Sequence, residues 1–493
     1  MRDRVKVLRG GPHPARSEGH PARSEGHPAR CGGHPARCGG HPARRSRTIR
    51  GGGRTTARWL AVTAGMTAAL TAGMAAAGCS PAGDAPEAPF RLTASHPPVA
   101  DGAGMPFVAA DAARFYMSWT EPTGEVGPTG RPVHAVRFAT LDADAGSDAG
   151  WSAPRTLAAS DRFFVNWADF PSIAAAGEGR LAAHWLLRSG DGTYDYDIVV
   201  STSGDGGDRW SEPRVMHADG VAAEHGFLSF FPQEEGFGAV WLDGRYTVGG
   251  HGDAEESGEG HGGGGAMTLR AGLLTWDGEA RDLDELDARI CDCCQTGAAV
   301  TDEGVVAVYR GRTQDEIRDI LAVRLVDGRW EAPAPVHDDG WQIPACPVNG
   351  PAVSAAGRRV VTAWFTGAGN EPRVSVAFSD DAGARWGPRI PVDTGAPLGR
   401  VDVELLPDGS ALVVWLEATA DEASIMARRV YADGRTGDAH PLALTSQVRA
   451  SGFPRMTRAG DRILLAWTEP AETRGQESTV RAAWLEVASP DIR

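Results

Sequence analysis

Two eight-residue stretches of one form stand far apart in this chain: Ser203-Gly-Asp-Gly-Gly-Asp-Arg-Trp210 and Ser379-Asp-Asp-Ala-Gly-Ala-Arg-Trp386. Ser, Asp, Gly and Trp occupy positions one, three, five and eight of both. An Asp in such a place caps its own turn and a Gly supplies a positive φ, so each stretch is predicted to be a tight turn whose Trp packs inward. The runs before them, YDIVVSTS and RVSVAFS, favour β-strands.

The two turns belong to a longer repeat of short apolar segments that end in an aromatic residue. The segments are RFYMSW, RLAAHW, GFGAVW, GVVAVY, RVVTAW, ALVVW and ILLAW, and they end at Trp119, Trp185, Trp241, Tyr309, Trp364, Trp415 and Trp467. Four short β-like runs in about 50 residues, with turn residues between them, are typical of one blade of a β-propeller. The repeat therefore predicts an all-β propeller of seven blades over residues 88–488.

The ends of this region predict how the ring closes. The last repeat stops at VRAAWLEV and lacks a fourth strand, whereas APFRLTAS at 88–95 is similar to SAPRTLAAS at 152–160, which follows the first repeat. The N-terminal strand is therefore expected to complete the last blade and to remove the open sheet edges that favour aggregation.

The S-x-D-x-G-x-x-W pattern resembles the Asp-box of the sialidase/BNR-repeat superfamily. The matching residues are Ser203, Asp205, Gly207, Trp210, Ser379, Asp381, Gly383 and Trp386. The resemblance implies a propeller, with six blades in the sialidases as the alternative to the count of seven. It also implies an axial ligand site where three arginines hold a sugar carboxylate, with an Asp acid/base and a Tyr nucleophile paired to a Glu.

The loops expected at the axial face are rich in arginine and carboxylate. They lead into the innermost strands or join the second and third strands. Candidates for catalysis are Asp169, Asp243, Tyr246 and Glu316, and candidates for binding substrate are Arg245, Arg310, Arg312, Arg318, Arg400, Arg455 and Asn349. The N-terminal F/Y-R-I-P motif of sialidases is not found before the first blade. Three functions stay open: binding of an anionic or carboxylated glycan, exo-sialidase-type hydrolysis, and cysteine-based metal or redox chemistry.

The stretch ICDCCQT at 290–296 raises that third alternative. With Cys346 it supplies four cysteines, Cys291, Cys293, Cys294 and Cys346, in loops that lead into the innermost strands of neighbouring blades. An even number of cysteines in an exported protein favours two disulfides. Thiolate ligation of Zn or Cu(I) is the second interpretation, and a redox pair of Cys291 and Cys294 is the third. The Gly-rich insertion 249–267 also carries two histidines, although a flexible loop is the simpler interpretation.

The N-terminus is predicted to lie outside the fold. Residues 1–58 hold a basic heptad repeat, GHPARSE or GHPARCG, that is too rich in Gly, Pro and Arg to bury a core. Residues 59–79 resemble a bacterial lipoprotein signal, with Ala76-Ala77-Gly78-Cys79 as the lipobox and Cys79 as the lipidated residue. Residues 80–87 are expected to be a linker and 489–493 a tail. The signal predicts an extracytoplasmic protein attached to the bacterial membrane by its lipid.

Charge separates this leader from the rest of the chain. Residues 1–58 carry 14 Arg and Lys against 3 Asp and Glu, and residues 59–78 carry none. The net charge of −15 for the whole chain therefore leaves −26 for residues 79–493. A polyacid of this kind repels nucleic acid and anionic lipid, which argues against both as partners.

Overall fold

A computed structural model describes residues 89–144, 150–248, 265–471 and 476–488 of the chain. The predicted leader, lipoprotein signal, linker and C-terminal tail lie outside these residues, as does most of the insertion 249–267. Within the described ranges the structure is almost entirely β, with two 3₁₀ turns, η1 (Ala368–Asn370) and η2 (Arg449–Ser451). No helix in this part of the chain is long and apolar enough to cross a membrane.

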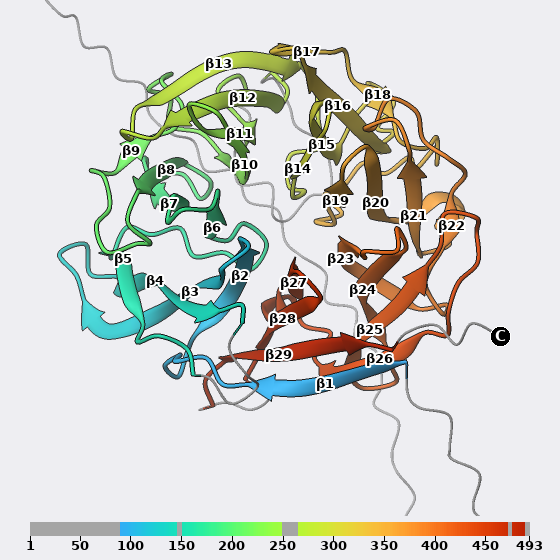
Figure 1. Ribbon diagram of the computed structural model, residues 1–493. Coiled ribbons are helices and arrows are strands. Elements are labelled where there is room, and N and C mark those ends of the chain that lie inside the picture. The colour runs from blue at the N-terminus through green and yellow to red at the C-terminus, as the bar shows by residue number, and fades with distance from the viewer. Residues whose placement is uncertain (1–88, 145–149, 249–264, 472–475, 489–493) are drawn as a thin grey trace, which may run out of the picture. The chain divides into compact units, whose positions relative to one another are not determined.

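The described strands form seven antiparallel sheets arranged as the blades of a β-propeller (Figure 1). Blade 1 contains β2 (Gly104–Ala110), β3 (Arg114–Val126), β4 (Pro132–Asp142) and β5 (Arg155–Ser160). Blade 2 contains β6 (Ser172–Ala175), β7 (Leu181–Arg188), β8 (Tyr196–Ser203) and β9 (Arg214–Val215). Blade 3 contains β10 (His225–Gln233), β11 (Gly236–Asp243), β12 (Thr268–Thr275) and β13 (Ala280–Asp287).

The remaining four blades follow the same order. Blade 4 contains β14 (Gly297–Thr301), β15 (Gly304–Arg310), β16 (Ile320–Val326), β17 (Arg329–Trp330) and β18 (Ala334–Pro335). Blade 5 contains β19 (Ala352–Ala356), β20 (Arg359–Thr366), β21 (Arg373–Ser379) and β22 (Ile390–Pro391). Blade 6 contains β23 (Pro397–Leu405), β24 (Ala411–Ala418), β25 (Ala423–Val430) and β26 (His440–Thr445). Blade 7 contains β27 (Arg455–Ala459), β28 (Arg462–Glu469), β29 (Thr479–Val487) and β1 (Phe90–Ser95).

Blade 7 confirms the predicted closure of the ring. Strand β1 pairs antiparallel with β29 from Phe90 opposite Val487 to Ser95 opposite Ala482, so the first strand of the described chain is the outermost strand of the last blade. The seven-blade prediction is thus confirmed, and the six-blade alternative is wrong. The two ends of the propeller are held together by main-chain hydrogen bonds, which leaves the ring without a free edge at its seam.

Neighbouring blades pack face to face, and this explains the apolar runs in the sequence. A strand in the middle of a blade is covered on both faces, so its residues need not alternate between apolar and polar. All eight residues of β11 are buried. The repeated aromatic residues Trp119, Trp241, Tyr309 and Trp364 are completely buried on such strands, as the repeat predicted.

The two S-x-D-x-G-x-x-W stretches form the same turn, each between the third and fourth strands of its blade. In the first, the amide of Gly207 donates to Ser203 Oγ at 2.9 Å and the amide of Arg209 donates to Asp205 Oδ1 at 2.9 Å. The second turn repeats both bonds at 2.9 Å. Gly207 has φ of +86°, and a Cβ there would lie 2.5 Å from the ring of Phe138 in blade 1. The glycine therefore lets the turn pack against the preceding blade.

Chain direction separates the two faces of the ring. Because successive strands are antiparallel, the loops that lead into the innermost strands lie on the same face as the loops between second and third strands. The turns of the S-x-D-x-G-x-x-W form join third and fourth strands, so they lie on the opposite face. The cysteines and the candidate site residues belong to the first of these faces.

Candidate functional site

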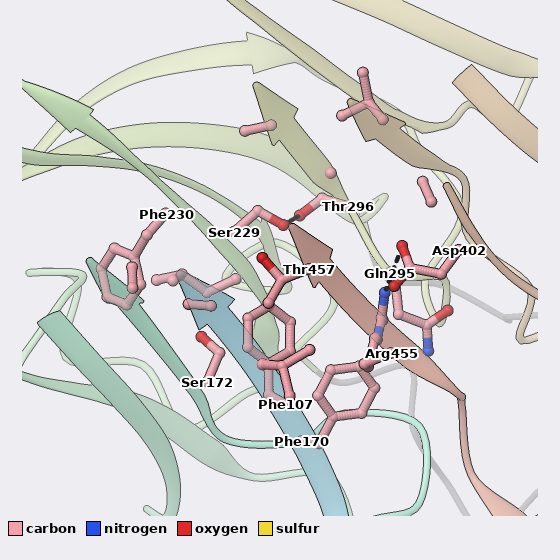
Figure 2. Close-up of a pocket in the computed structure, with 18 of the residues that line it drawn as sticks. Phe107, Phe170, Ser172, Ser229, Phe230, Gln295, Thr296, Asp402, Arg455 and Thr457 are labelled. Atoms are coloured by element: carbon pink, nitrogen blue, oxygen red, sulfur yellow. Dashed lines mark hydrogen bonds and ion pairs between the residues drawn. The ribbon is translucent and has the colours of Figure 1, made fainter. Parts of the chain in front are cut away.

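A pocket of about 280 Å³ lies on the propeller axis and is lined by residues of the innermost strands and of the loops before them (Figure 2). Its lining combines phenylalanine rings with short polar side chains and four charged groups. The aromatic and polar lining residues are Phe107, Phe170, Phe227, Phe230, Ser172, Ser229, Gln295, Thr296 and Thr457, and the charged ones are Asp169, Asp402, Glu404 and Arg455. Pockets of this size hold small ligands, since drug-sized ligands occupy about 300–1,000 Å³.

Arg455 is the one guanidinium that lines the pocket. Its side chain is 12% exposed, and it lies against the rings of Phe107, Phe170 and Phe453 at 4.7–5.6 Å. Its only polar contact within the described residues is with Asp402, at 4.0 Å, and its buried Nε has no hydrogen-bond partner. A buried donor of a charged group that lacks a hydrogen-bond partner is energetically costly.

Asp169, Asn349 and Asp402 act first as links between neighbouring blades. Asp169 Oδ1 accepts from the amide of Phe227 in blade 3 at 2.9 Å. Asn349 Oδ1 accepts from the amide of Arg400 in blade 6 at 2.7 Å. Asp402 Oδ2 accepts from the amide of Met456 in blade 7 at 2.8 Å. Each side chain satisfies a buried backbone donor of the next blade, as buried polar groups require.

Backbone irregularities at the start of the innermost strands make these links fit. Phe227 and Arg400 both have φ of 55°, and each lies in a β-bulge that shifts the register of its strand. The glycine before Phe227 is sterically required, because a Cβ on Gly226 would lie 1.8 Å from Asp169 Oδ2. Bulges of this kind re-aim the chain and are frequent beside functional sites.

Asp169 also belongs to a buried acidic cluster. The hydroxyl of Tyr196 lies 3.0 Å from Asp169 Oδ2 and 3.1 Å from Glu224 Oε1. A hydroxyl carries a single proton, so one of the two carboxyls must itself be protonated to make both bonds. Burial raises the pKa of Asp169 to about 7, and burial together with the charges of Asp292 and Asp169 raises the pKa of Glu224 well above its usual value.

Two of the other predicted arginines are bound to main-chain oxygens instead of facing the pocket. Arg310 is completely buried and donates to the carbonyls of Arg318, Asn349 and Phe365 at 2.6–3.0 Å. Arg400 donates to Ser451 Oγ and to the carbonyls of Val448 and Gly452. These guanidinium groups tie loops of different blades together.

Arg312, Arg318 and Glu316 form an ion-pair network beside the cysteines. Glu316 accepts from Arg312 at 2.7 Å and from Arg318 at 2.8 Å, and Arg312 also binds Asp292 at 3.1 Å. Although burial raises the pKa of Glu316, the bonds from Arg312 and Arg318 outweigh it and lower that pKa. The glutamate is therefore held as a carboxylate by arginines of its own loop.

Asp243 and Arg245 form an ion pair, whereas Tyr246 is exposed to solvent. Asp243 is completely buried and accepts from Trp241 Nε1 at 2.9 Å and from Arg245 at 2.7 Å. Tyr246 is 52% exposed. The Trp-x-acid bond recurs in other blades, at 2.7 Å from Trp119 to Glu121 and from Trp415 to Glu417. These acids anchor the repeated tryptophans, and the recurring W-x-D/E pattern was visible in the sequence.

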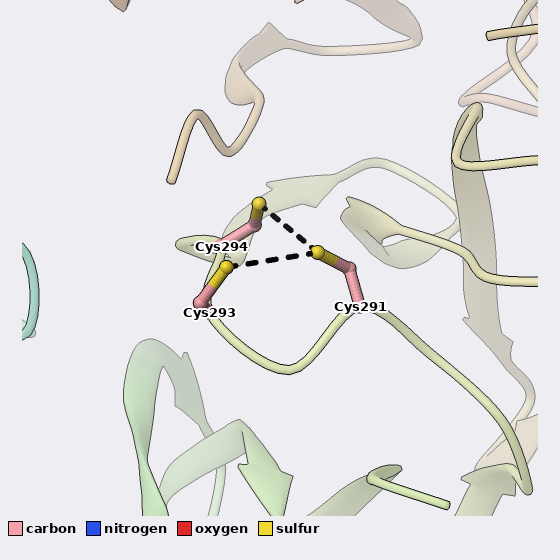
Figure 3. Close-up of side chains that lie close together, drawn as sticks. All are labelled: Cys291, Cys293 and Cys294. Atoms are coloured by element: carbon pink, nitrogen blue, oxygen red, sulfur yellow. Dashed lines mark hydrogen bonds between the residues drawn. The ribbon is translucent and has the colours of Figure 1, made fainter. Parts of the chain in front are cut away.

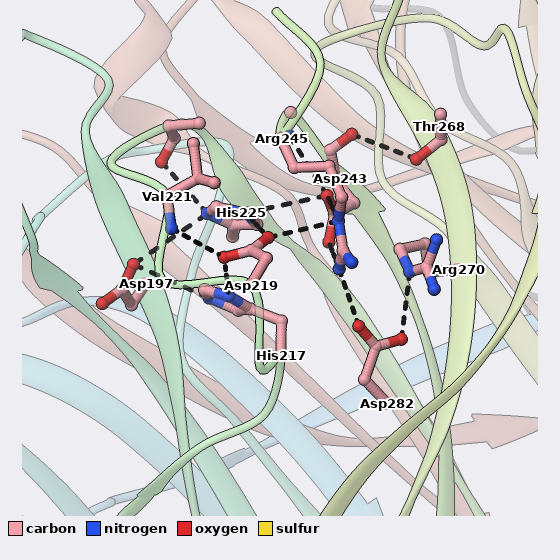
Figure 4. A network of polar contacts seen from close by, with 12 residues as sticks. Asp197, His217, Asp219, Val221, His225, Asp243, Arg245, Thr268, Arg270 and Asp282 are labelled. Carbon is pink, nitrogen blue, oxygen red and sulfur yellow. Dashed lines mark hydrogen bonds and ion pairs between the residues drawn. The ribbon is translucent and has the colours of Figure 1, made fainter. Parts of the chain in front are cut away.

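Two stacked histidines, His217 and His225, lie in a network of charged and polar side chains beside blade 3 (Figure 4). His225 Nε2 donates to Asp219 at 2.9 Å, and its Nδ1 faces the carbonyls of Ala223 and Tyr196 at 3.2 and 3.3 Å. Burial lowers the pKa of His225, but Asp219, Asp243 and Asp197 outweigh it and raise it. Acceptors face both ring nitrogens of His225 and favour its protonated form, which has no lone pair for a metal ion.

The cysteines of the 290–296 loop come together without a disulfide bond (Figure 3). Cys291 Sγ lies 3.3 Å from Cys294 Sγ and 4.0 Å from Cys293 Sγ, far beyond the ~2.05 Å of an S–S bond. Cys346, before β19, is not one of the three sulfur atoms that lie within 4.8 Å of one another, but it is near enough to raise the pKa of Cys293. All four are free thiols in this structure, so the predicted pair of disulfides is not present, while the predicted proximity of the two loops is.

Sequence reasoning missed three residues of this face, Tyr196, Glu224 and Gln295. Gln295 Nε2 donates to the carbonyl of Ala168 at 2.7 Å, and its Oε1 accepts from the amide of Gly350 at 3.0 Å. Gln295 thus joins three neighbouring loops of the axial face. No motif marked these positions, because their partners lie between 27 and 127 residues away along the chain.

Comparison with known proteins adds solved structures of low similarity. No protein-family model and no curated protein matches the chain. Among solved structures, a protein of unknown function from Dyadobacter fermentans is 14% identical, with a TM-score of 0.45, over 81% of this chain and all of its own. A variant of NanB sialidase from Streptococcus pneumoniae is 11% identical, with a TM-score of 0.40, over 81% of this chain and 92% of its own. The phage phi92 endosialidase is 9% identical, with a TM-score of 0.45, over 82% and 70%. Scores this low transfer no activity to this chain.

Proposed function

We propose that this propeller binds a small carboxylated sugar in its axial pocket and that Arg455 is the residue that holds the carboxylate. The observation that carries the proposal is the guanidinium itself, which lines the pocket with a buried and unpartnered Nε. Ligand carboxylates bound to such donors make charge-assisted hydrogen bonds, which are stronger than neutral ones. The surrounding phenylalanine rings offer apolar faces to a sugar ring, and the Ser and Thr hydroxyls offer partners for its hydroxyl groups.

Three carboxyl groups share the pocket with Arg455, and their protonation decides whether an anion can enter. Burial raises the pKa of Asp169 to about 7, burial and the charge of Asp402 raise that of Glu404 to about 8, and burial raises that of Asp402. Below pH 7 the protonated forms remove most of the repulsion. Affinity for a carboxylate is therefore expected to be highest in mildly acidic solution and to fall as pH rises from 6 to 9.

Binding of N-acetylneuraminic acid, glucuronic acid and glucose to the purified protein tests this proposal by calorimetry or ligand-observed NMR. The two acids should bind and glucose should not. Arg455→Gln should weaken binding roughly 10- to 100-fold, the equivalent of the ~1.5–3 kcal/mol of a hydrogen bond to a charged group. Arg458→Gln is the matched control, because Arg458 lies on the same strand and donates to the carbonyls of Leu405 and Gly460. Equal binding of glucose, or unchanged binding by the Arg455 variant, would overturn the proposal.

Hydrolysis of a glycoside is the second candidate function, and Asp169 is the observation that favours it. A carboxyl with a pKa of about 7 in a sugar-sized pocket has the property of a general acid that works near neutral pH. Release of an aglycone from a carboxylated glycoside, abolished by Asp169→Asn while ligand binding persists, is the expected result. Absence of turnover across sialosides and glucuronides would leave binding alone.

We also propose that the propeller is exported and held at the membrane by a lipid on Cys79. The lipobox-like Ala76-Ala77-Gly78-Cys79 supports this location. Mass spectrometry of the membrane fraction should find a diacylglyceryl group on Cys79, and Cys79→Ser should move the protein to the soluble fraction. An unmodified Cys79 in membrane-bound protein would contradict the proposal.

A further inference from the structure

A group of cysteines lies on the axial face outside the pocket, in the loop that leads into β14. Three thiols meet there within 4.8 Å of one another, and Cys346 of the next blade lies outside this group but near enough to Cys293 to raise the pKa of that thiol. Cys291 and Cys294 are buried, Cys293 is half-buried and Cys346 is exposed. We propose that these four cysteines form a binding site for one thiophilic d¹⁰ metal ion, Zn²⁺ or Cu⁺.

The separations between the sulfur atoms suit ligands of one ion. Tetrahedral Zn²⁺ with Zn–S bonds of ~2.3 Å places its sulfur ligands about 3.8 Å apart. The observed separations of 3.3 and 4.0 Å from Cys291 Sγ lie on either side of this value. The sulfur atoms point toward one another, as Figure 3 shows. Cu⁺ prefers the same soft thiolate ligands, so both ions fit this donor set.

The positively charged guanidinium of Arg318 lies next to the sulfur atoms. Arg318 Nη1 donates to Cys291 Sγ at 3.2 Å, and this arginine is 1% exposed. Its Nε is buried and has no hydrogen-bond partner. A buried guanidinium bound to sulfur stabilises a thiolate over a thiol, and several thiolates around one d¹⁰ ion carry a net negative charge. Arg318 would offset part of that charge in the loaded site.

The ligand loops are also held in place before any ion binds. The amide of Cys291 donates to the carbonyl of Arg310 at 3.0 Å. At the other end of the loop, Thr296 Oγ1 donates to the carbonyl of Phe227 at 2.7 Å. Gln295 accepts from the amide of Gly350, four residues after Cys346, and so connects the two cysteine loops. A site of this kind loses little conformational entropy on binding.

The direct test is a metal titration of protein purified and reduced without oxygen. Co²⁺, as a probe for the Zn²⁺ site, should bind one to one and give the charge-transfer and visible bands of tetrahedral cobalt thiolate. Cu⁺, delivered from a colorimetric chelator, should bind with the same stoichiometry. Competition between the two ions identifies which one the site prefers. A thiol count on the denatured protein should find these four cysteines free, in addition to whichever of Cys31, Cys38 and Cys79 the purified chain carries as a thiol.

Variants separate ligation from folding. Cys291→Ser and Cys294→Ser should abolish stoichiometric binding, while Arg318→Gln should keep it with roughly 10- to 100-fold lower affinity, the usual effect of losing a partner of a metal ligand. Asp292→Asn is the control in the same loop, since it removes a carboxylate bound to Arg312 and leaves every sulfur in place; it should still bind one ion. Circular dichroism and thermal unfolding of each variant show whether the propeller is intact.

Two results would overturn this inference. One is a folded, fully reduced protein that binds neither Co²⁺ nor Cu⁺ at one equivalent. The other is a protein that forms disulfides between these cysteines when purified without oxygen, which would return the group to the structural role first expected. Neither result bears on Arg455, so failure of the metal site and failure of the carboxylate pocket are told apart.

Discussion

Replacing Asp169 with asparagine should change the pH dependence of stability in a defined direction. The pKa of Asp169 is about 7 in the folded protein, against 3.8 for an unperturbed aspartate. Because its folded pKa is the higher one, the folded state holds this proton more tightly than the unfolded state between about pH 4 and 7. The contribution of Asp169 to the free energy of unfolding therefore falls as pH rises through this window and is lowest above pH 7.

The magnitude follows from the same two values. Three pKa units at about 1.36 kcal/mol each give an upper bound of roughly 4 kcal/mol. Asparagine does not ionise and keeps an oxygen for the amide of Phe227. Because the unfolded carboxyl is already mostly ionised at pH 4.5, Asp169→Asn should gain about 3 kcal/mol relative to the native protein between pH 4.5 and pH 8.

Urea unfolding of native and variant protein at steps of pH measures this difference. Asp381→Asn is the control: hydrogen bonds from Arg385 and Ser379 outweigh the effect of burial and lower the pKa of Asp381 to about 2, so that its contribution is lost only below pH 4. Its difference from the native protein should be constant over the same range. A constant difference for Asp169→Asn as well would refute the reasoning and place the shared proton of the cluster on Glu224, which Glu224→Gln would then reveal.

Three further perturbations test the packing that positions the axial face. Arg310→Met leaves three main-chain oxygens without their buried donor, so urea unfolding should show a loss of roughly 3–5 kcal/mol; a loss of ligand affinity at unchanged stability would contradict this. Gly226→Ala places a Cβ 1.8 Å from Asp169 Oδ2 and should cost roughly 1–3 kcal/mol by the same assay. Gly204→Ala is the control, because that glycine has open space around it and no positive φ, and it should lack this cost. Deletion of residues 90–95 exposes the edge of β29, and size-exclusion chromatography should show aggregation; a monomer of native thermal stability would mean that β1 is dispensable.

The blade count could be predicted because each blade repeats the same short apolar segment that ends in an aromatic residue. An aromatic residue in the second strand recurs every 51 to 68 residues and is buried in six blades and half-buried in blade 7, and the missing outer strand of blade 7 has a counterpart at the N-terminus. These signals lie within single repeats of the sequence. The fold and its closure therefore followed from pattern alone, including the placement of the cysteines before β14 and β19.

The roles of the arginines could not be predicted in the same way. Arg310 and Arg455 both lie at strand ends on the axial face, yet one donates to the carbonyls of Asn349 and Phe365 and the other lines the pocket. The difference depends on carbonyl groups 39 and 55 residues away from Arg310, which only the folded ring brings near. Composition and loop position identify which residues reach the axial face but not which of them remain free to bind a ligand.

Gln295 connects the pocket and the cysteine cluster through a hydrogen bond and through its place in the chain. It follows Cys294 directly, and its amide binds the carbonyl of Ala168, the residue before Asp169. An ion bound to Cys294 would fix the backbone on one side of this bond, and a ligand that packs against Asp169 would fix the other. However, because this bond and the bond from the amide of Gly350 to Gln295 already hold both loops before any ligand binds, neither ligand should save the other much ordering entropy. The affinity of the axial pocket for a carboxylated sugar should therefore be nearly the same with and without metal. Gln295→Ala removes both bonds, so it should lower the affinity of both sites, since each ligand must then order its own loop.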